Sequence, residues 1–181
     1  MTDKRKIYEA LAHSELTDIL LRNFTENSTL LLSYAQFCDD YKTHYFDDSH
    51  PELGRCFVIE VDGIAIGQVN YNEIESDKNR TELDIWMFSE KLCGNGHGSE
   101  ALRLLCDYLR REMKVDGFYI KPSMSNPRAI RAYQKAGFFM TKLAGEEAEV
   151  EYGSRLDSIN SVYMTRNIEP VVSDNADKPR V

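Results

Sequence analysis

Three segments in the middle of the chain have the composition and alternation of β-strands: residues 55–61, 64–71 and 81–88. Only Asp62 and Gly63 separate the first two, and an Asp-Gly pair in that position predicts a two-residue hairpin turn. Shorter apolar stretches predict further strands nearer the C-terminus, at residues 117–123, 138–144 and 158–168. Residues 55–168 therefore predict the strands of a sheet.

The third segment alternates most regularly. One set of its side chains is apolar: Leu83, Ile85 and Met87. The intervening set carries two carboxylates and an indole: Glu82, Asp84 and Trp86. Because successive side chains of a strand point to opposite faces, the first set predicts a core face. The second set predicts either the wall of a pocket or a solvated face.

Helical spacing of apolar residues is found on both sides of this segment. The N-terminal part predicts mainly helix, at residues 13–24 and 33–46, after a short strand at residues 6–11. Residues 98–113 predict an amphipathic helix with one apolar face: Leu102, Leu105, Cys106, Leu109 and Met113.

A second helix is predicted after the strand at residues 117–123. Asn126 suits its N-cap, Pro127 its first position and Gly137 its end. The order of elements predicts a single α+β domain at residues 1–169, followed by a polar tail at 170–181.

The composition is that of an ordinary globular domain, because 42% of the 181 residues are hydrophobic. The sequence has no apolar run of about 18 residues to span a membrane, and its N-terminus lacks the apolar core of a secretory signal. The scattered cysteines form no C-x-x-C pair, which argues against a zinc site. We therefore expect a cytoplasmic protein without a metal ion.

Charge narrows the class of partner. The formal net charge is −8, and Glu73, Glu75 and Asp77 form one of several acidic clusters. An acidic field repels nucleic acid and attracts cations. Ordinary solubility and a cationic ligand both explain this charge, and the sequence leaves both open.

A glycine-rich loop precedes the amphipathic helix: Cys93, Gly94, Asn95, Gly96, His97, Gly98 and Ser99. Such a loop leaves backbone N–H groups free at the start of the helix, where the helix dipole also favours an anion. The loop lacks the G-K-[ST] of a Walker A motif and the G-x-G-x-x-G spacing of a dinucleotide fold. A phosphate group bound by backbone amides and a flexible turn are the two interpretations.

The loop resembles the pyrophosphate loop of the GNAT N-acetyltransferase superfamily, whose pattern is Q/R-x-x-G-x-G/A. Gly96 and Gly98 match it, and Cys93 departs from its first position. A second motif of the superfamily, N-x-x-[AS]-x-x-x-Y-x-x-x-G-F, is matched in full by Asn126, Ala129, Tyr133, Gly137 and Phe138. The resemblance implies a mixed, mostly antiparallel sheet of about six or seven strands, flanked by about four helices. It also implies that this sheet is splayed beside residues 82–88.

The resemblance further implies acetyl-CoA as the co-substrate. Backbone N–H groups of the glycine loop would bind its pyrophosphate, and those of Trp86, Met87 and Phe88 its pantetheine arm. Asn126 would also contact pantetheine, and Tyr133 would protonate the leaving thiolate. Arg128 would either reach the 3′-phosphate or solvate its helix.

The stretch NPRAIRAYQKAGF resembles aminoglycoside 6′-N-acetyltransferases, which implies a small polycationic acceptor and a role in antibiotic resistance. Asp84 lies at the distance before the glycine loop where those enzymes carry an aspartate, so it would contact the accepting amine. Glu82 and Glu73 would complete the acceptor site. Lys121 departs from their pattern, because an acid is common at that position.

Two alternatives stay open. The acceptor could be a protein N-terminus, a lysine or a polyamine instead of an aminoglycoside. The chain could also bind acyl-CoA without transferring its acyl group. Many members of the superfamily form dimers, so a homodimer is a further expectation from the resemblance.

Overall fold

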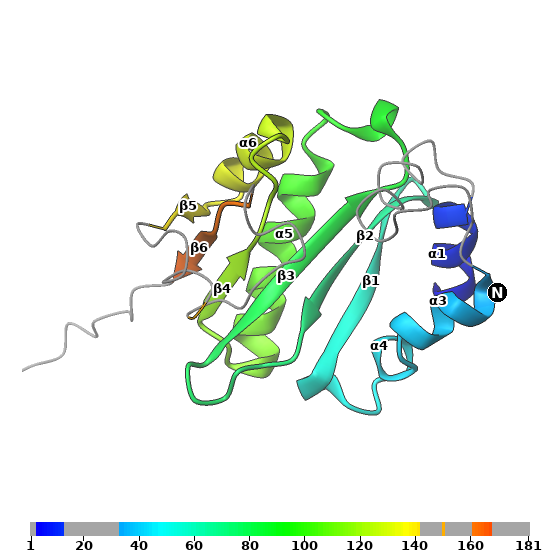
Figure 1. Cartoon of the computed structure of the whole chain (residues 1–181), viewed down its shortest axis with the longest axis horizontal. Coiled ribbons are helices and arrows are strands. Elements are labelled where there is room, and N and C mark those ends of the chain that lie inside the picture. Colours follow the sequence, from blue (N-terminus) through cyan, green and yellow to red (C-terminus); the bar gives the residue numbers. More distant parts are fainter. Residues whose placement is uncertain (1–2, 13–32, 142–149, 151–160, 168–181) are drawn as a thin grey trace, which may run out of the picture.

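A six-stranded sheet forms the centre of the structure, in the order β1-β2-β3-β4-β6-β5 (Figure 1). The computed structural model describes residues 3–12, 33–141, 150 and 161–167. The strands are β1 (Gly54–Val61), β2 (Ile64–Asn72), β3 (Arg80–Met87), β4 (Gly117–Ile120), β5 (Phe139–Met140) and β6 (Met164–Asn167). The predicted strands are thus present within the described residues, although the C-terminal ones are shorter than expected.

The hairpin between β1 and β2 forms as predicted. Asp62 has a φ of 50° and Gly63 a φ of 77°. A two-residue turn with positive φ at both positions matches the right-handed twist of the flanking strands. Aspartate and glycine tolerate this conformation better than other residues do.

The pairing of β3 with β4 opens the sheet. This pair is parallel and holds three residue pairs, which end at Glu82 and Tyr119. β3 continues to Met87 and stays paired with β2 along that length. Beyond Glu82, the edge of β3 that faces β4 is therefore unpaired with it, and the predicted splay is confirmed (Figure 1).

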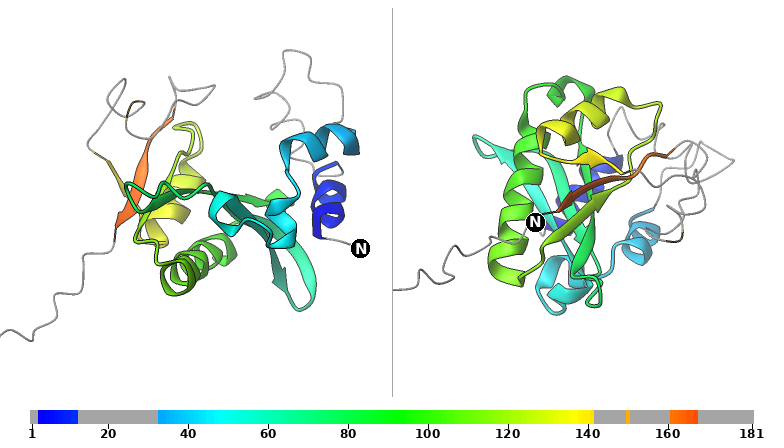
Figure 2. Two further views of the ribbon diagram at one scale, coloured as in Figure 1. Left: turned by 90° about the horizontal axis from the view of Figure 1, so that it is seen from below. Right: turned by 90° about the vertical axis from the view of Figure 1, so that its left-hand side faces the viewer.

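Helices lie against both faces of the sheet: α1 (Asp3–Ala12), α3 (Tyr34–Asp40), α4 (His44–Asp47), α5 (His97–Tyr108) and α6 (Pro127–Lys135). Buried side chains of α5 pack on those of β2, β3 and β4 in the larger core cluster. Ile7 of α1 and Phe37 of α3 form a second cluster with Cys56 of β1. Figure 2 shows α1 and α3 beside β1, at the opposite end of the sheet from α6.

Two predictions for the N-terminal part are corrected. The expected strand at residues 6–11 belongs to α1, where Arg5 and Glu9 form an ion pair at 2.9 Å. Side chains four residues apart are neighbours on a helix, but they lie too far apart along a strand to form this pair. The helix expected at 33–46 is broken at Tyr41, whose φ of −90° and ψ of 90° are not helical. The helix predicted at 13–24 and the tail at 170–181 lie outside the described residues.

The two helices of the sequence motifs form as expected. α5 buries Leu102, Leu105 and Cys106, and a π-helical turn (Leu109–Met113) prolongs it. α6 begins at Pro127, with Asn126 as its N-cap. In the part of the chain that the structure describes, no helix is long and apolar enough to cross a membrane.

Candidate active site

The glycine loop forms an open turn at the start of α5. Gly94 and Gly96 have φ values of 88° and 92°, and a Cβ added to either would meet no atom within 4 Å. Gly96 is the N-cap and supplies no side chain, and the first helical bond runs from Glu100 N to Gly96 O at 3.0 Å. The N–H groups of His97, Gly98 and Ser99 therefore lie at the positive end of the helix, without helical partners.

This turn fits a phosphate group. Its amides are at the helix N-terminus, and the open space beside Gly94 and Gly96 lets a ligand approach the backbone. The neighbouring Gly98 packs closely on the sheet, because an added Cβ would lie 3.5 Å from Ile85 Cδ1. The start of α5 is thus held against β3, beside the point where the sheet opens.

Two of the loop residues take part in other contacts. The Cys93 N–H donates to Glu90 O at 3.0 Å, and its thiol donates to Ser89 O at 3.6 Å. The Ser99 hydroxyl donates to Ala132 O of α6 at 2.9 Å. Cys93 therefore offers a ligand neither backbone nor thiol donor in this arrangement, and Ser99 offers its N–H group alone. The predicted role of Cys93 in binding the cofactor stays a prediction.

The Ser99 contact also joins the two sequence motifs. It links the first turn of α5 to α6, the helix that carries Tyr133. Tyr133 is 9% exposed and packs in the larger core cluster. The motifs lie next to each other in space although they are far apart in the sequence.

The N-terminus of α6 is held by side chains. Asn126 Oδ1 accepts a hydrogen bond from Ala129 N at 3.0 Å, which is the contact expected of an N-cap. Arg128 forms an ion pair at 3.5 Å with Glu90, in the 3-10 turn (Glu90–Leu92) directly before the glycine loop. Arg128 therefore lies on the loop side of α6 rather than pointing away from it.

The open edge of β3 offers one of the three predicted amides. Phe88 N donates to Ile66 O of β2 at 3.0 Å. Because alternate residues of a strand bond to opposite edges, the Trp86 N–H also points to β2 and the Met87 N–H points to the open side. Of the three predicted pantetheine contacts, Met87 is thus the one whose amide is directed to the open side, and the contacts themselves stay predictions.

Asp84 is exposed on the face of the sheet that the alternation assigned to polar residues. Its Oδ1 accepts from the Ile85 N–H at 2.9 Å. Directly opposite Asp84 on β2 is Asn70. Paired residues of neighbouring strands point to the same face, so the Asp84 carboxylate and the Asn70 amide share one wall.

Asn70 belongs to a row of amides on β2 that the sequence reasoning missed. Gln68 Nε2 donates to the Tyr41 hydroxyl at 2.8 Å, and the Tyr45 hydroxyl donates to Asn72 Oδ1 at 3.1 Å. The sequence does contain a signal for this row, because its amides alternate with Val69 and Tyr71 along the strand. Buried amides at every second position indicate a polar wall.

Two oxygens of this row have no partner. Gln68 Oε1 and Asn70 Oδ1 are buried and accept no hydrogen bond from any residue that the structure describes. Burying such an acceptor without a donor costs about 1–3 kcal/mol. Native proteins keep few such groups, and functional sites are one place where they occur.

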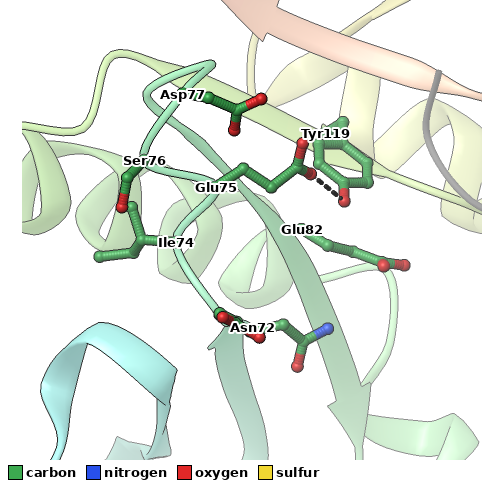
Figure 3. A pocket seen from close by; sticks show the side chains of 8 residues that line it. Asn72, Ile74, Glu75, Ser76, Asp77, Glu82 and Tyr119 are labelled. Atoms are coloured by element: carbon green, nitrogen blue, oxygen red, sulfur yellow. Dashed lines mark hydrogen bonds between the residues drawn. The ribbon is translucent and has the colours of Figure 1, made fainter.

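A cavity of about 650 Å³ opens at the end of this polar face (Figure 3). Its lining is mainly acidic and polar: Asn72, Glu73, Ile74, Glu75, Ser76, Asp77, Glu82 and Tyr119. Glu73 and Glu82, two predicted acceptor residues, line it together. Asp84 does not line it, but it lies two residues beyond Glu82 on the same face of β3.

Tyr119 and Glu75 join the two sides of the cavity. The Tyr119 hydroxyl donates to Glu75 Oε1 at 2.7 Å, and Arg80 donates to Glu75 Oε2 at 2.9 Å. Burial raises the pKa of Tyr119 well above its ordinary value, and the Glu75 carboxylate raises it further. Tyr119 is therefore a neutral donor at physiological pH.

Lys121 does not itself line this cavity, but it contacts Glu82, which does. Its side chain is 7% exposed, and its ammonium donates to Glu82 Oε2 at 3.0 Å. The acidic residue expected at this position in aminoglycoside acetyltransferases is thus replaced by a cation that neutralises Glu82.

Comparison with known proteins gives a family from the sequence and a shared fold from solved structures. A model of the acetyltransferase (GNAT) domain matches residues 3–139. The spermidine N(1)-acetyltransferase of Escherichia coli (strain K12) is 31% identical over 106 residues, which make up 59% of this chain and 54% of that enzyme. The aminoglycoside N(6′)-acetyltransferase type 1 of Klebsiella pneumoniae is 36% identical over 66 residues, or 36% of this chain and 33% of that enzyme.

The chain therefore aligns with about half the length of the first of these relatives, and less of the second. The crystal structure of an aminoglycoside acetyltransferase with coenzyme A and kanamycin has a TM-score of 0.63 and 21% identity. The superposition covers 92% of this chain and 91% of that one.

Proposed function

Because the chain belongs to the GNAT acetyltransferase family, we propose that it transfers the acetyl group of acetyl-CoA to a primary amine of a small polycation. The observation that carries the proposal is the position of two features on either side of β3. The open amide turn of α5 packs against one face, and a carboxylate wall lies on the other. A thioester and an amine bound to them would approach each other at the gap between β3 and β4.

The described residues fit coenzyme A at three points. The amides of His97, Gly98 and Ser99 would bind its pyrophosphate, since they have no helical partners. The Met87 N–H would bind the pantetheine arm at the open edge of β3. Arg128 would reach a phosphate by exchanging its exposed ion pair with Glu90 for a new one.

The acceptor side fits an ammonium group. An ammonium has three N–H donors and no acceptor. The exposed Asp84 carboxylate would accept two of them, and the Asn70 amide, buried opposite it, has an Oδ1 without a donor among the described residues. Asp84 would also take up a proton from the amine, directly or through water, so that the nitrogen can attack.

Acetyl-CoA, when bound, supplies the acetyl group as an activated thioester. Tyr133 would protonate the departing thiolate, since a phenol with a pKa of about 10 can donate to a thiolate whose conjugate acid has a pKa of about 8.5. Direct transfer requires no covalent intermediate on the enzyme. The roles of Asp84 and Tyr133 come from the family motifs and from their positions beside β3 and α5.

The leading acceptor is the 6′-amine of an aminoglycoside, which would make the protein an antibiotic-resistance enzyme of the cytoplasm. A polyamine is the second candidate, and a specific observation favours it. The match to spermidine acetyltransferase is longer, at 106 residues against 66. Both acceptors are small polycations, and the acidic cavity suits either.

Thiol release from acetyl-CoA, measured with a panel of amines, tests the proposal. Kanamycin, spermidine and a lysine-containing peptide represent the three acceptor classes. We expect acetylation of at least one of the first two, with mass spectrometry giving a gain of one acetyl group. The proposal is wrong if acetyl-CoA binds and none of these amines is acetylated, which is the outcome expected of a non-catalytic acyl-CoA-binding protein.

A further inference from the structure

Among the residues that the structure describes, two of the carboxylates that line the acidic cavity are paired with cations, and the other two are not. Of its four carboxylates, Glu75 is paired with Arg80 at 2.9 Å and Glu82 with Lys121 at 3.0 Å. Glu73 and Asp77 form no ion pair with any residue that the structure describes. In the view of Figure 3, Glu75 and Tyr119 lie between Asp77 and Glu82.

Lys121 is buried beside this wall and is bonded to one of its carboxylates, Glu82. Its side chain is 7% exposed, and its ammonium also lies 5.5 Å from the centroid of the Tyr119 ring. Such a cation is stabilised by both the carboxylate and the ring face. Removing one partner of a buried pair leaves the other charge uncompensated, so the pair is expected to persist when a ligand binds.

We propose that Lys121 determines acceptor specificity, as a tethered cation that occupies the position at Glu82 where an inner ammonium of a polycation would otherwise bind. This inference rests on the proposed function and narrows its substrate class. The preferred acceptor is an elongated amine with one cation at Asp84, another near Asp77 or Glu73, and an uncharged spacer between them.

The physical reason is repulsion between like charges. An ammonium placed beside Lys121 would share Glu82 with a cation that stays bonded to it, and like charges in contact repel each other in a poorly solvated site. A methylene group at the same place meets no such penalty. Specificity therefore arises from a repulsive group as well as from attractive ones.

A pair of amines of equal length isolates the effect. Norspermidine and 1,7-diaminoheptane differ only in their central group, which is a secondary ammonium in the first and a methylene in the second. For the unaltered protein we expect the dissociation constant of the diamine, measured by titration calorimetry, to be equal to or lower than that of the triamine. The ratio of the two KM values in the acetylation assay should follow the same order.

Lys121→Met removes the cation and keeps the length of the side chain. We expect it to lower the dissociation constant and KM of norspermidine about tenfold relative to those of 1,7-diaminoheptane, or about 1.4 kcal/mol. Lys121→Arg keeps the charge and should keep the original ratio. Lys121→Met combined with Glu82→Gln removes both charges, keeps the wall neutral, and should lose the gain.

Calorimetry separates the failure of this inference from that of the proposed function, because it does not require acetyl transfer. A ratio that changes less than twofold in Lys121→Met, with both amines still binding, overturns the role of Lys121 and leaves the acetyltransferase proposal intact. Binding of both amines without acetylation refutes the proposed function while the ratio still tests Lys121. If neither amine binds the unaltered protein, the inference is wrong as well.

Discussion

Asp84 is the residue on which the acceptor site depends most. It is exposed, it accepts the Ile85 N–H, and it faces Asn70 across the β2–β3 pair. A carboxylate in this position can both bind a cation and accept its proton, whereas an amide of the same shape can only bind. Replacing Asp84 with asparagine therefore keeps the shape of the side chain and removes its charge and its ability to accept a proton.

We expect Asp84→Asn to lower kcat/KM for the amine about 10²–10³-fold, because general-base catalysis contributes gains of that order. The KM for acetyl-CoA should change little, since the side chain lies on the opposite face from the glycine turn. Steady-state kinetics with both substrates varied would measure this. Asp62→Asn in the exposed hairpin turn makes the same chemical change outside the site and should leave the kinetics unaltered.

Replacing Asn70 is expected to stabilise the fold while weakening the binding of the amine. Its Oδ1 is a buried acceptor without a donor among the described residues, so Asn70→Leu should raise the free energy of unfolding of the ligand-free protein by about 1 kcal/mol. The same change should raise KM for the amine. Asn72→Leu is the matched control, since it removes the bond from the Tyr45 hydroxyl and should lower stability instead. A loss of stability in Asn70→Leu equal to that of the control would show that the amide has an ordinary structural role.

At the scale of elements, α6 shows how local signals place a motif. Asn126, Pro127 and Gly137 gave the start and end of this helix from the sequence, because capping and positive φ depend on neighbours in the chain. The cap also occupies the Asn126 oxygen. Its amide nitrogen is the part of the side chain that the cap leaves to a pantetheine arm.

The cap is testable by itself. Asn126→Ala should lower the free energy of unfolding by about 1 kcal/mol, the usual contribution of an N-cap. Asn126→Asp retains an oxygen acceptor and should restore most of that loss, as judged from urea denaturation. If KM for acetyl-CoA rises in both variants, the amide nitrogen contacts the cofactor in addition to the cap.

The acceptor site shows where the sequence is insufficient. The alternation in β3 placed Glu82 and Asp84 on one face, and the structure agrees. The ion pair between Glu82 and Lys121 spans 39 positions, and the bond between Tyr119 and Glu75 spans 44. These contacts depend on the parallel pairing of β3 with β4, which no local pattern specifies. The break at Tyr41 has a similar cause, since its ring stacks on Phe37 and its hydroxyl accepts from Gln68.

For the whole molecule, two buried thiols contribute to the loss of stability at alkaline pH. Burial raises the pKa of Cys56 and of Cys106 from 9.0 to about 12. Below pH 9 both thiols are protonated in the folded and unfolded states, so they add no pH dependence. Between pH 9 and 12 the unfolded chain loses these protons and the folded protein keeps them, so stability falls as the pH rises.

We expect the urea midpoint to be flat with respect to these thiols up to pH 9 and to decline above it. Cys106→Ala removes one of the two groups and should make the decline shallower, although the variant starts from a lower stability because of the cavity. Denaturation curves at pH 8, 9, 10 and 11 would provide the slope. Equal slopes in both proteins would assign the decline to other groups, such as Tyr71, whose pKa burial raises to about 12.

The short junction between β3 and β4 makes the sheet two smaller sheets joined along a seam of three residue pairs. A cofactor whose amide groups bond to Met87 would occupy the place of a missing strand and would hold the two smaller sheets together. Its binding should therefore slow amide hydrogen exchange in β4 and β6 as well as in β3. Protection that reached these distant strands would reveal the gap between the two halves as the most compliant part of the domain.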